Sequence, residues 1–205
     1  MPARERERNT VKTQDLKDLF DAEYAEHLAV AQATRGALGP ALADLVARAE
    51  AAVRGGGKIL LFGNGGSAGD AQHLATELTV RYARDRAPIA ALALTTDTSV
   101  LTAAGNDLGF EQIFARQVRA LGRPGDLAIG ISTSGRSPNV IEGLRAARAL
   151  GLTAAALTGG DGGDLKGLAD PLLIVPSKTV ARIQEMHITL GQIFCAGLER
   201  ALGLV

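Results

Sequence analysis

Residues 58–77 read KILLFGNGGSAGDAQHLATE, an apolar run that breaks into glycines and then restarts with helical spacing. The run Ile59–Phe62 is short and wholly apolar, as expected of a strand that is covered on both faces. The glycines that follow allow the backbone to turn sharply and to approach a ligand closely. The segment therefore predicts a strand, a tight turn over residues 63–67, called the glycine turn below, and a helix.

The helix after the glycine turn begins with unpaired N–H groups, which favour an anion. Ser67 or Asp70 is a candidate for its capping residue. Farther along, His73 and Glu77 are spaced i, i+4, so both side chains project from one face of the helix. They could hold a metal, act as acid and base, or form a helix-face pair of little consequence. Their position near a turn suited to phosphate favours a reaction centre.

Composition limits the class of protein. The 205 residues fit one domain with a substantial core, or one domain plus an appended helical arm. The 22 basic and 22 acidic side chains balance, which gives no reason to expect nucleic acid or an anionic membrane as partner. Cys195 is the only cysteine and cannot form an internal disulfide, and no apolar run approaches the ~20 residues of a membrane span. We expect a cytoplasmic protein.

The N-terminal part predicts a tail and two helices. Residues 1–10 are polar and of mixed charge, which indicates a flexible tail, and we expect residues 11–205 to form one domain. Apolar spacing predicts helices over 11–37 and 41–53, separated by glycines and by Pro40. These helices exceed what a five-strand α/β unit needs, so their apolar faces pack on their own domain or on a second subunit. His27 has no evident chemical neighbour, which indicates a structural role.

The rest of the chain alternates between strand and helix signals. Strands are expected at 59–62, 89–94, 127–131, 152–157 and 172–175, and helices at 97–104, 110–121, 139–150 and 179–202. This alternation predicts an α/β fold with a five-stranded parallel sheet flanked by helices in three layers, preceded by the extra N-terminal helices.

Ligands of parallel sheets bind beyond the carboxyl ends of the strands, where residues 132–137 are expected. These residues, called the hydroxyl turn below, read STSGRS and carry four hydroxyl groups. Ser137 fits the cap of the next helix and Pro138 its first position. Hydroxyl and N–H groups can surround a phosphate, and the helix end supplies partial positive charge. Four hydroxyls exceed what one cap requires, so we favour phosphate binding over a turn that only caps its helix.

The sequence GNGGSA at 63–68 also matches a loose dinucleotide-binding pattern. That pattern expects an acidic residue for the ribose about 20 residues farther on. Asp97 lies well past this spacing, and a dinucleotide site does not require His73 and Glu77 one turn apart. We therefore place a nucleotide-dependent enzyme behind the phosphate-binding interpretation.

Five motifs, in order and at similar spacings, resemble the phosphoheptose isomerases, which are sedoheptulose 7-phosphate isomerases of the sugar isomerase (SIS) fold. The motifs are Gly63–Ser67, Asp70–His73 with Glu77, Asn106–Asp107, Ser132–Gly135 with Ser137, and Arg182–His187. The resemblance runs from about residue 12 to the C-terminus. It implies a flavodoxin-like SIS fold, a homotetramer with sites at subunit interfaces, and a place early in ADP- or GDP-heptose biosynthesis, which supplies lipopolysaccharide heptose.

By the same resemblance, the enzyme converts sedoheptulose 7-phosphate to D-glycero-D-manno-heptose 7-phosphate through an enediol. Glu77 is the implied catalytic base, and His73, Glu77 and Gln184 are the implied ligands of one zinc ion per subunit. The serines of the hydroxyl turn are implied to hold the phosphate. The implied substrate contacts are Asn64, Gly65, Gly66, Glu77, Asn106, Asp107, Ser132, Thr133, Ser134, Ser137 and Gln184. This chemistry needs a positioned base and a group that stabilises an oxyanion, which agrees with a carboxylate beside a metal.

One position departs from the family pattern. The family's second histidine, eight positions after the glutamine, is Gln192 here, about 80° around the helix from Gln184, so the two side chains could still converge. His187 is an imperfect substitute, because it points about 60° to the other side. An amide can ligate a metal but cannot shuttle protons near neutral pH. We therefore hypothesise that Glu77 carries the proton alone, with a metal or water assisting.

The departure also leaves a non-enzyme alternative. A related group of SIS proteins keeps the glycine and serine turns, lacks the second histidine and works as a tetrameric regulator that binds the bacterial replication initiator. That group tends to lose the acidic residue, whereas this chain retains Glu77 and an intact Asn-Gly-Gly-Ser turn. The sequence therefore favours the isomerase over the regulator.

Overall fold

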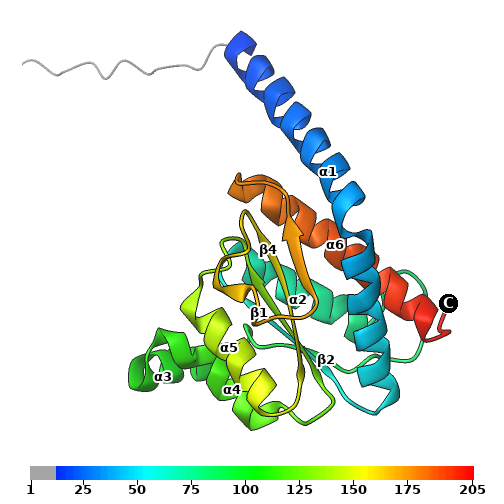
Figure 1. Cartoon of the computed structure of the whole chain (residues 1–205), viewed down its shortest axis with the longest axis vertical. Helices are drawn as coiled ribbons and strands as arrows, with labels where there is room; N and C mark the ends of the chain where they lie inside the picture. Colours follow the sequence, from blue (N-terminus) through cyan, green and yellow to red (C-terminus); the bar gives the residue numbers. More distant parts are fainter. Residues whose placement is uncertain (1–12) are drawn as a thin grey trace, which may run out of the picture.

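The computed structural model describes residues 13–205, so the tail expected at 1–10 lies outside the described residues. After one long N-terminal helix, strands are interleaved with helices along most of the chain (Figure 1). The elements are α1 (Thr13–Arg54), β1 (Ile59–Gly63), α2 (Gly66–Thr79), β2 (Ala91–Ala93), α3 (Thr98–Leu108), α4 (Ile113–Leu121), β3 (Leu127–Ser132), α5 (Pro138–Ala149), β4 (Thr153–Gly159), β5 (Leu172–Val175) and α6 (Val180–Ala201), with 3₁₀ turns at Phe110–Gln112 and Gly163–Leu165.

The five strands form one parallel sheet in the order β2-β1-β3-β4-β5. This is the strand order of flavodoxin-like folds, and it confirms the predicted fold class. Successive side chains of β1 point to opposite faces of the sheet. Leu61 enters a cluster formed with α1, α2 and α6, whereas Phe62 enters a second cluster with α3, α4 and α5. Each face of the sheet is therefore covered by its own layer of helices.

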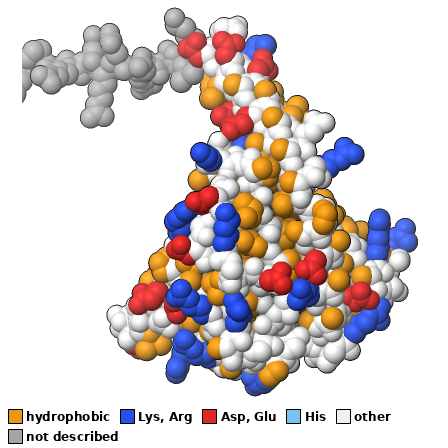
Figure 2. Space-filling model, in the orientation of Figure 1, with side chains coloured by type: hydrophobic (Ala, Val, Ile, Leu, Met, Phe, Trp, Pro, Cys, Tyr) orange, Lys and Arg blue, Asp and Glu red, His pale blue; other side chains and the backbone are white. Residues whose placement is uncertain are grey.

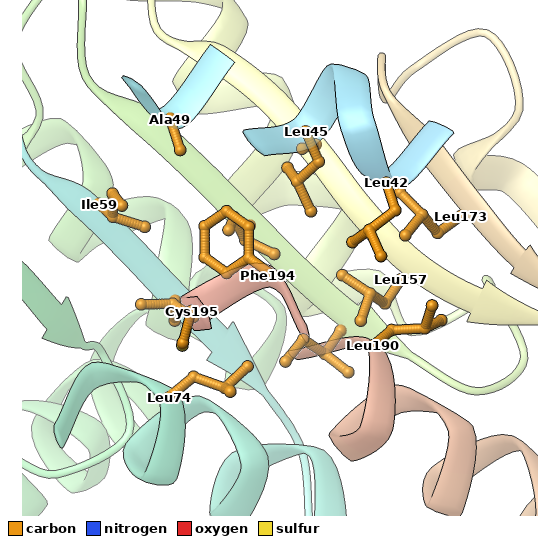
Figure 3. Close-up of a cluster of buried hydrophobic side chains, with 14 of the residues drawn as sticks. Leu42, Leu45, Ala49, Ile59, Leu74, Leu157, Leu173, Leu190, Phe194 and Cys195 are labelled. Atoms are coloured by element: carbon orange, nitrogen blue, oxygen red, sulfur yellow. The ribbon is translucent and has the colours of Figure 1, made fainter. Parts of the chain in front are cut away.

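The cluster on the α1 side packs the first helix, α1, against the last helix, α6. Phe194 of α6 lies at its centre, with Leu45 of α1 and Leu74 of α2 around it (Figure 3). All three side chains are at most 2% exposed. Because such interiors pack at crystal-like density, this cluster fixes α2 and α6 relative to each other.

The prediction of two N-terminal helices is wrong, because α1 is continuous through Pro40. The ring of a helical proline conflicts with the carbonyl four residues earlier, which here belongs to Gly36. Both residues lie on the exposed side, and a Cβ on Gly36 would meet no atom within 4 Å. On the other side a buried stripe runs past the proline through Thr34, Leu38 and Leu42. Burial of this stripe therefore outweighs the local breakers.

Two helix starts and ends also differ from expectation. Neither Ser67 nor Asp70 caps α2, because its N-cap is Gly65, with φ 54° and no side-chain cap. Asp97 caps α3 by accepting from the N–H of Val100 at 3.0 Å, and the helix runs on to Leu108 instead of ending at residue 104. None of the helices within residues 13–205 combines the length and apolar character that a membrane span requires.

Candidate active site

The glycine turn and the hydroxyl turn lie side by side at the carboxyl edge of the sheet. Their strands β1 and β3 are paired, with Gly63 opposite Ile131. The amide side chains of Asn64 and Asn139 exchange two hydrogen bonds of 2.8 Å across the turns. Asn64 keeps free hydrogen-bonding capacity for a ligand, because an amide offers more than one donor and acceptor site. Asn139, which the sequence interpretation did not single out, is therefore part of the site's framework.

The glycine turn is packed tightly against its surroundings. A Cβ on Gly63 would lie 2.7 Å from the carbonyl oxygen of Ile131. A Cβ on Gly66 would lie 2.7 Å from Nε2 of Gln184, so this side chain of α6 lies directly on the turn. The space that the missing side chain of Gly66 leaves open is therefore occupied partly by the side-chain amide of Gln184.

The hydroxyl turn presents its side chains in two directions. Ser132 is buried, and its Oγ lies 2.9 Å from Oγ of Ser137. Ser137 is the N-cap of α5 by position, yet its hydroxyl makes no cap hydrogen bond. Thr133 and Ser134 line a hollow of about 380 Å³. Ser132 and Ser137 therefore meet at the start of α5, which is an arrangement suited to an anion, whereas Thr133 and Ser134 face the hollow.

His73 and Glu77 meet one residue of α6. Nε2 of His73 lies 3.2 Å from Oε1 of Glu77 and 2.5 Å from Nε2 of Gln192. Glu77 is the more enclosed of the two, with 19% of its side chain exposed against 46% for His73. The structure thus brings an imidazole, a carboxylate and an amide to one point.

Helices α2 and α6 run side by side in the same direction. Gly66 lies against Gln184 near their starts, and His73 lies against Gln192 farther on. Residues 184 and 192 are eight positions apart, which is about 12 Å along a helix. The two amides of α6 therefore mark the two ends of the candidate site, one at the glycine turn and one at the His73–Glu77 pair.

The candidate contacts Asn106 and Asp107 lie elsewhere in this chain. They are exposed residues of α3, and Nδ2 of Asn106 donates to Oδ1 of Asp107 at 2.7 Å. Asp107 lines a hollow of about 720 Å³ whose lining includes no residue of the glycine turn or of the hydroxyl turn. Within one chain the structure does not bring these two residues to the other implied contacts.

The remaining histidines have structural partners. His27, for which no neighbour was expected, lies with Nδ1 2.7 Å from Oε2 of Glu185. His187 is fully buried, and its Nε2 lies 3.1 Å from the carbonyl oxygen of Thr158 in β4. Burial lowers the pKa of His187 to about 4, against the opposing effect of the Thr158 hydrogen bond. Because this side chain is buried against β4, it does not replace the missing second histidine.

The buried His187 predicts a pH-dependent stability. The pKa of His187 in the folded protein, about 4, lies below its ordinary value of 6.5. Neutral His187 is therefore fully compatible with folding above pH ~6.5, and the free energy of unfolding falls as the pH drops toward 4. The full effect is roughly 3 kcal/mol in the free energy of unfolding. Urea titrations at pH 7 and 4.5 measure it. We expect a smaller loss in His187→Gln, and an equal loss in both proteins would contradict the assignment.

Two more titratable groups flank the site. One carboxylate oxygen of Asp70 is buried without a hydrogen-bond partner, and burial raises the pKa of this residue against the opposing charge of His73. Burial, together with the charges of Glu77 and Glu199, raises the pKa of Cys195 to about 12, so this thiol is no nucleophile. Within residues 13–205, no three His, Cys, Asp or Glu side chains gather to hold a metal. Any metal at His73 and Glu77 would therefore also need amide oxygens.

Comparison with known proteins places the chain among isomerases of similar size. The SIS domain family matches residues 23–159. A phosphoheptose isomerase of Paramagnetospirillum magneticum is 57% identical over 88% of this chain and 94% of its own length. One from Aquifex aeolicus is 56% identical over 77% of this chain and 83% of its own length.

A solved structure agrees with these sequence matches. The phosphoheptose isomerase from Neisseria gonorrhoeae is 45% identical and superposes with a TM-score of 0.85, over 90% of this chain and 99% of that one. Fold, sequence and length thus match together. The chain belongs to the phosphoheptose isomerase family of SIS-domain proteins.

Proposed function

We propose that this chain isomerises sedoheptulose 7-phosphate to D-glycero-D-manno-heptose 7-phosphate. The observation that carries the proposal is the enclosed carboxylate of Glu77 beside His73 and Gln192, on the helix that begins at the glycine turn. The relatives that are 50–57% identical bear the name phosphoheptose isomerase. The regulatory alternative gains no support at this level of identity.

The proposed mechanism separates binding from proton transfer. The hydroxyls of the hydroxyl turn and the N-terminus of α5 hold the phosphate. Glu77 removes a proton from C1 of the ketose and returns it to C2, while a hydroxyl proton moves from O1 to O2. Negative charge develops on O2 in between and is stabilised by His73 beside Glu77, while Gln184 contacts the substrate at the other end of the site.

A divalent metal, with zinc as the proposed ion, fits this donor set. His73 and Glu77 carry zinc-type donors, and Gln192 converges on the same nitrogen of His73 at 2.5 Å. A half-turn of the amide about its last bond presents oxygen instead of nitrogen. His73 and Glu77 would hold the ion with Gln192 as the oxygen donor, because Gln184, the third implied ligand, lies eight positions earlier on α6, at the glycine turn. When bound, it would supply Lewis-acid polarisation of the substrate carbonyl.

We further propose a homotetramer whose interfaces include the N-terminal arm, defined here as residues 13–28 of α1. This arm extends beyond the body of the molecule (Figure 1) and carries hydrophobic side chains on its surface (Figure 2). The exposed apolar residues are Leu16, Leu19, Phe20, Tyr24 and Leu28, each at least 53% exposed. A contiguous apolar surface of this kind marks an interaction site. The proposed setting is the cytoplasm and the early steps of ADP- or GDP-heptose biosynthesis.

The arm predicts an assembly defect. Phe20→Glu places a charge in the apolar stripe, and we expect smaller assemblies than in the wild type, because burying an unpaired charge is costly. Ala22→Glu is the matched control, since residue 22 lies about 200° around the helix from residue 20. Sedimentation velocity measures both. An unchanged size in Phe20→Glu, or equal losses in the two variants, would count against the arm as an interface.

The proposed function is tested with purified protein and sedoheptulose 7-phosphate. Aldose formation is followed by NMR, with chelator and after zinc is restored. Turnover that the chelator abolishes and zinc recovers supports the isomerase with its metal. Turnover that survives the chelator supports the isomerase without it. Binding of the sugar phosphate without turnover overturns the proposed function.

A further inference from the structure

We propose that the buried ion pair of Arg86 and Glu199 is a positioning pair for the catalytic carboxylate of Glu77. The inference rests on the proposed isomerase function. Arg86 comes from the loop after α2, and Glu199 comes from the last two turns of α6, so neither belongs to the motifs of the site. Their side chains are only 1% and 2% exposed.

Arg86 grips the end of the helix that carries Glu77. One terminal nitrogen donates to the main-chain carbonyl of Glu77 at 2.8 Å, and the other donates to the carbonyl of Leu78 at 2.7 Å. These carbonyls belong to the last turn of α2, where no intrahelical donor is available. The guanidinium also places positive charge at the negative end of the helix dipole. Arg86 thus fixes the backbone from which Glu77 projects.

Glu199 fixes the guanidinium in turn. Its Oε1 accepts from Nε of Arg86 at 2.7 Å and from the N–H of Tyr82 at 3.2 Å. Glu199 lies seven positions after Gln192, about two turns farther along α6. Through Arg86, the end of α2 is therefore tied to the helix that supplies the amide facing His73.

The pair completes a series of contacts between α2 and α6. Gln184 lies on the glycine turn, Gln192 meets His73, and Glu199 holds the end of α2 through Arg86. A buried carboxylate without its partner is strongly disfavoured, so loss of either member would displace this segment. A small displacement of a reacting group can lower the rate by about 10²-fold even when the altered residue is far from the chemistry.

The test compares Glu199→Gln and Arg86→Lys with a matched pair elsewhere. Lys58 and Asp126 also form an ion pair, with Nζ 2.6 Å from Oδ2, and the side chain of Asp126 is 2% exposed. Lys58 immediately precedes β1, and Asp126 immediately precedes β3. We expect kcat to fall by 10- to 100-fold in both test variants, with KM changed by less than about two-fold. Asp126→Asn lowers the melting temperature and leaves kcat at the wild-type value. All assays run below the onset of unfolding.

A second readout is independent of the reaction. Hydrogen exchange of the last turn of α2 is expected to accelerate in Glu199→Gln and to stay unchanged in Asp126→Asn. Unchanged kcat in a folded Glu199→Gln variant would overturn the positioning role, as would a fall in kcat that Asp126→Asn reproduces. If the wild-type protein has no isomerase activity, the proposed function is wrong. In that case, an unchanged rate of hydrogen exchange in Glu199→Gln would separately show that the ion pair does not hold the end of α2.

Discussion

Glu77→Gln is expected to lower kcat by about 10³-fold, with little change in the binding of the sugar phosphate. The substitution keeps the shape of the side chain and removes its ability to accept a proton. Because Gln192 has no titratable group in place of the family's histidine, no second base at this position can compensate. Steady-state kinetics and calorimetric binding of sedoheptulose 7-phosphate measure the two effects.

The control for this variant is Glu50→Gln. Glu50 lies on α1, where its carboxylate pairs with Arg54 at 2.8 Å. An exposed i, i+4 pair contributes a few tenths of a kcal/mol, so this change leaves both activity and folding intact. If Glu77→Gln turned over like Glu50→Gln, the proton would have to be carried by another group.

The second large effect is expected in Gly135→Ala. Gly135 is buried in the hydroxyl turn with φ 66°, and a Cβ there would overlap the carbonyl oxygen of Gly162. The backbone strain and the overlap together cost about 2–5 kcal/mol. The hydroxyl turn would shift to relieve the overlap, so we expect KM to rise by at least about ten-fold. Thermal melting and steady-state kinetics check both results.

Gly160→Ala separates strain from overlap. Gly160 also has a positive φ, of 62°, but a Cβ there meets nothing within 4 Å. Its cost should stay near the 1–2 kcal/mol of the left-handed conformation alone. Equal effects of the two alanines on KM would show that the hydroxyl turn does not depend on the fit between Gly135 and Gly162.

The sheet could be predicted from sequence because its signals are local. The strands β1, β3 and β5 are short apolar runs next to glycines, hydroxyl residues or prolines, and each lies within a residue or so of its predicted position. Helix α1 could not be placed by the same rule. Pro40 is a strong local breaker, and only the buried stripe that continues past it, which depends on tertiary packing, keeps the helix intact.

The candidate site was predictable to the extent that it follows strand ends and helix faces. His73 and Glu77 share a face because of their spacing, and Gln192 reaches them as the helix period allows. The Arg86–Glu199 pair had no such signal, because its members are 113 positions apart. From sequence alone, an arginine in a charged loop is expected to be exposed to solvent, and only the folded structure shows that Arg86 is buried.

The parallel course of α2 and α6 limits how this protein can change in evolution. Between Gln184 and Gln192, many substitutions would leave both amides where they are. A single inserted or deleted residue would swing one amide by about 100° relative to the other and carry it off the site. Active homologues should therefore differ in the residue types of this segment but not in its length. An alignment of the family would show the segment without insertions or deletions.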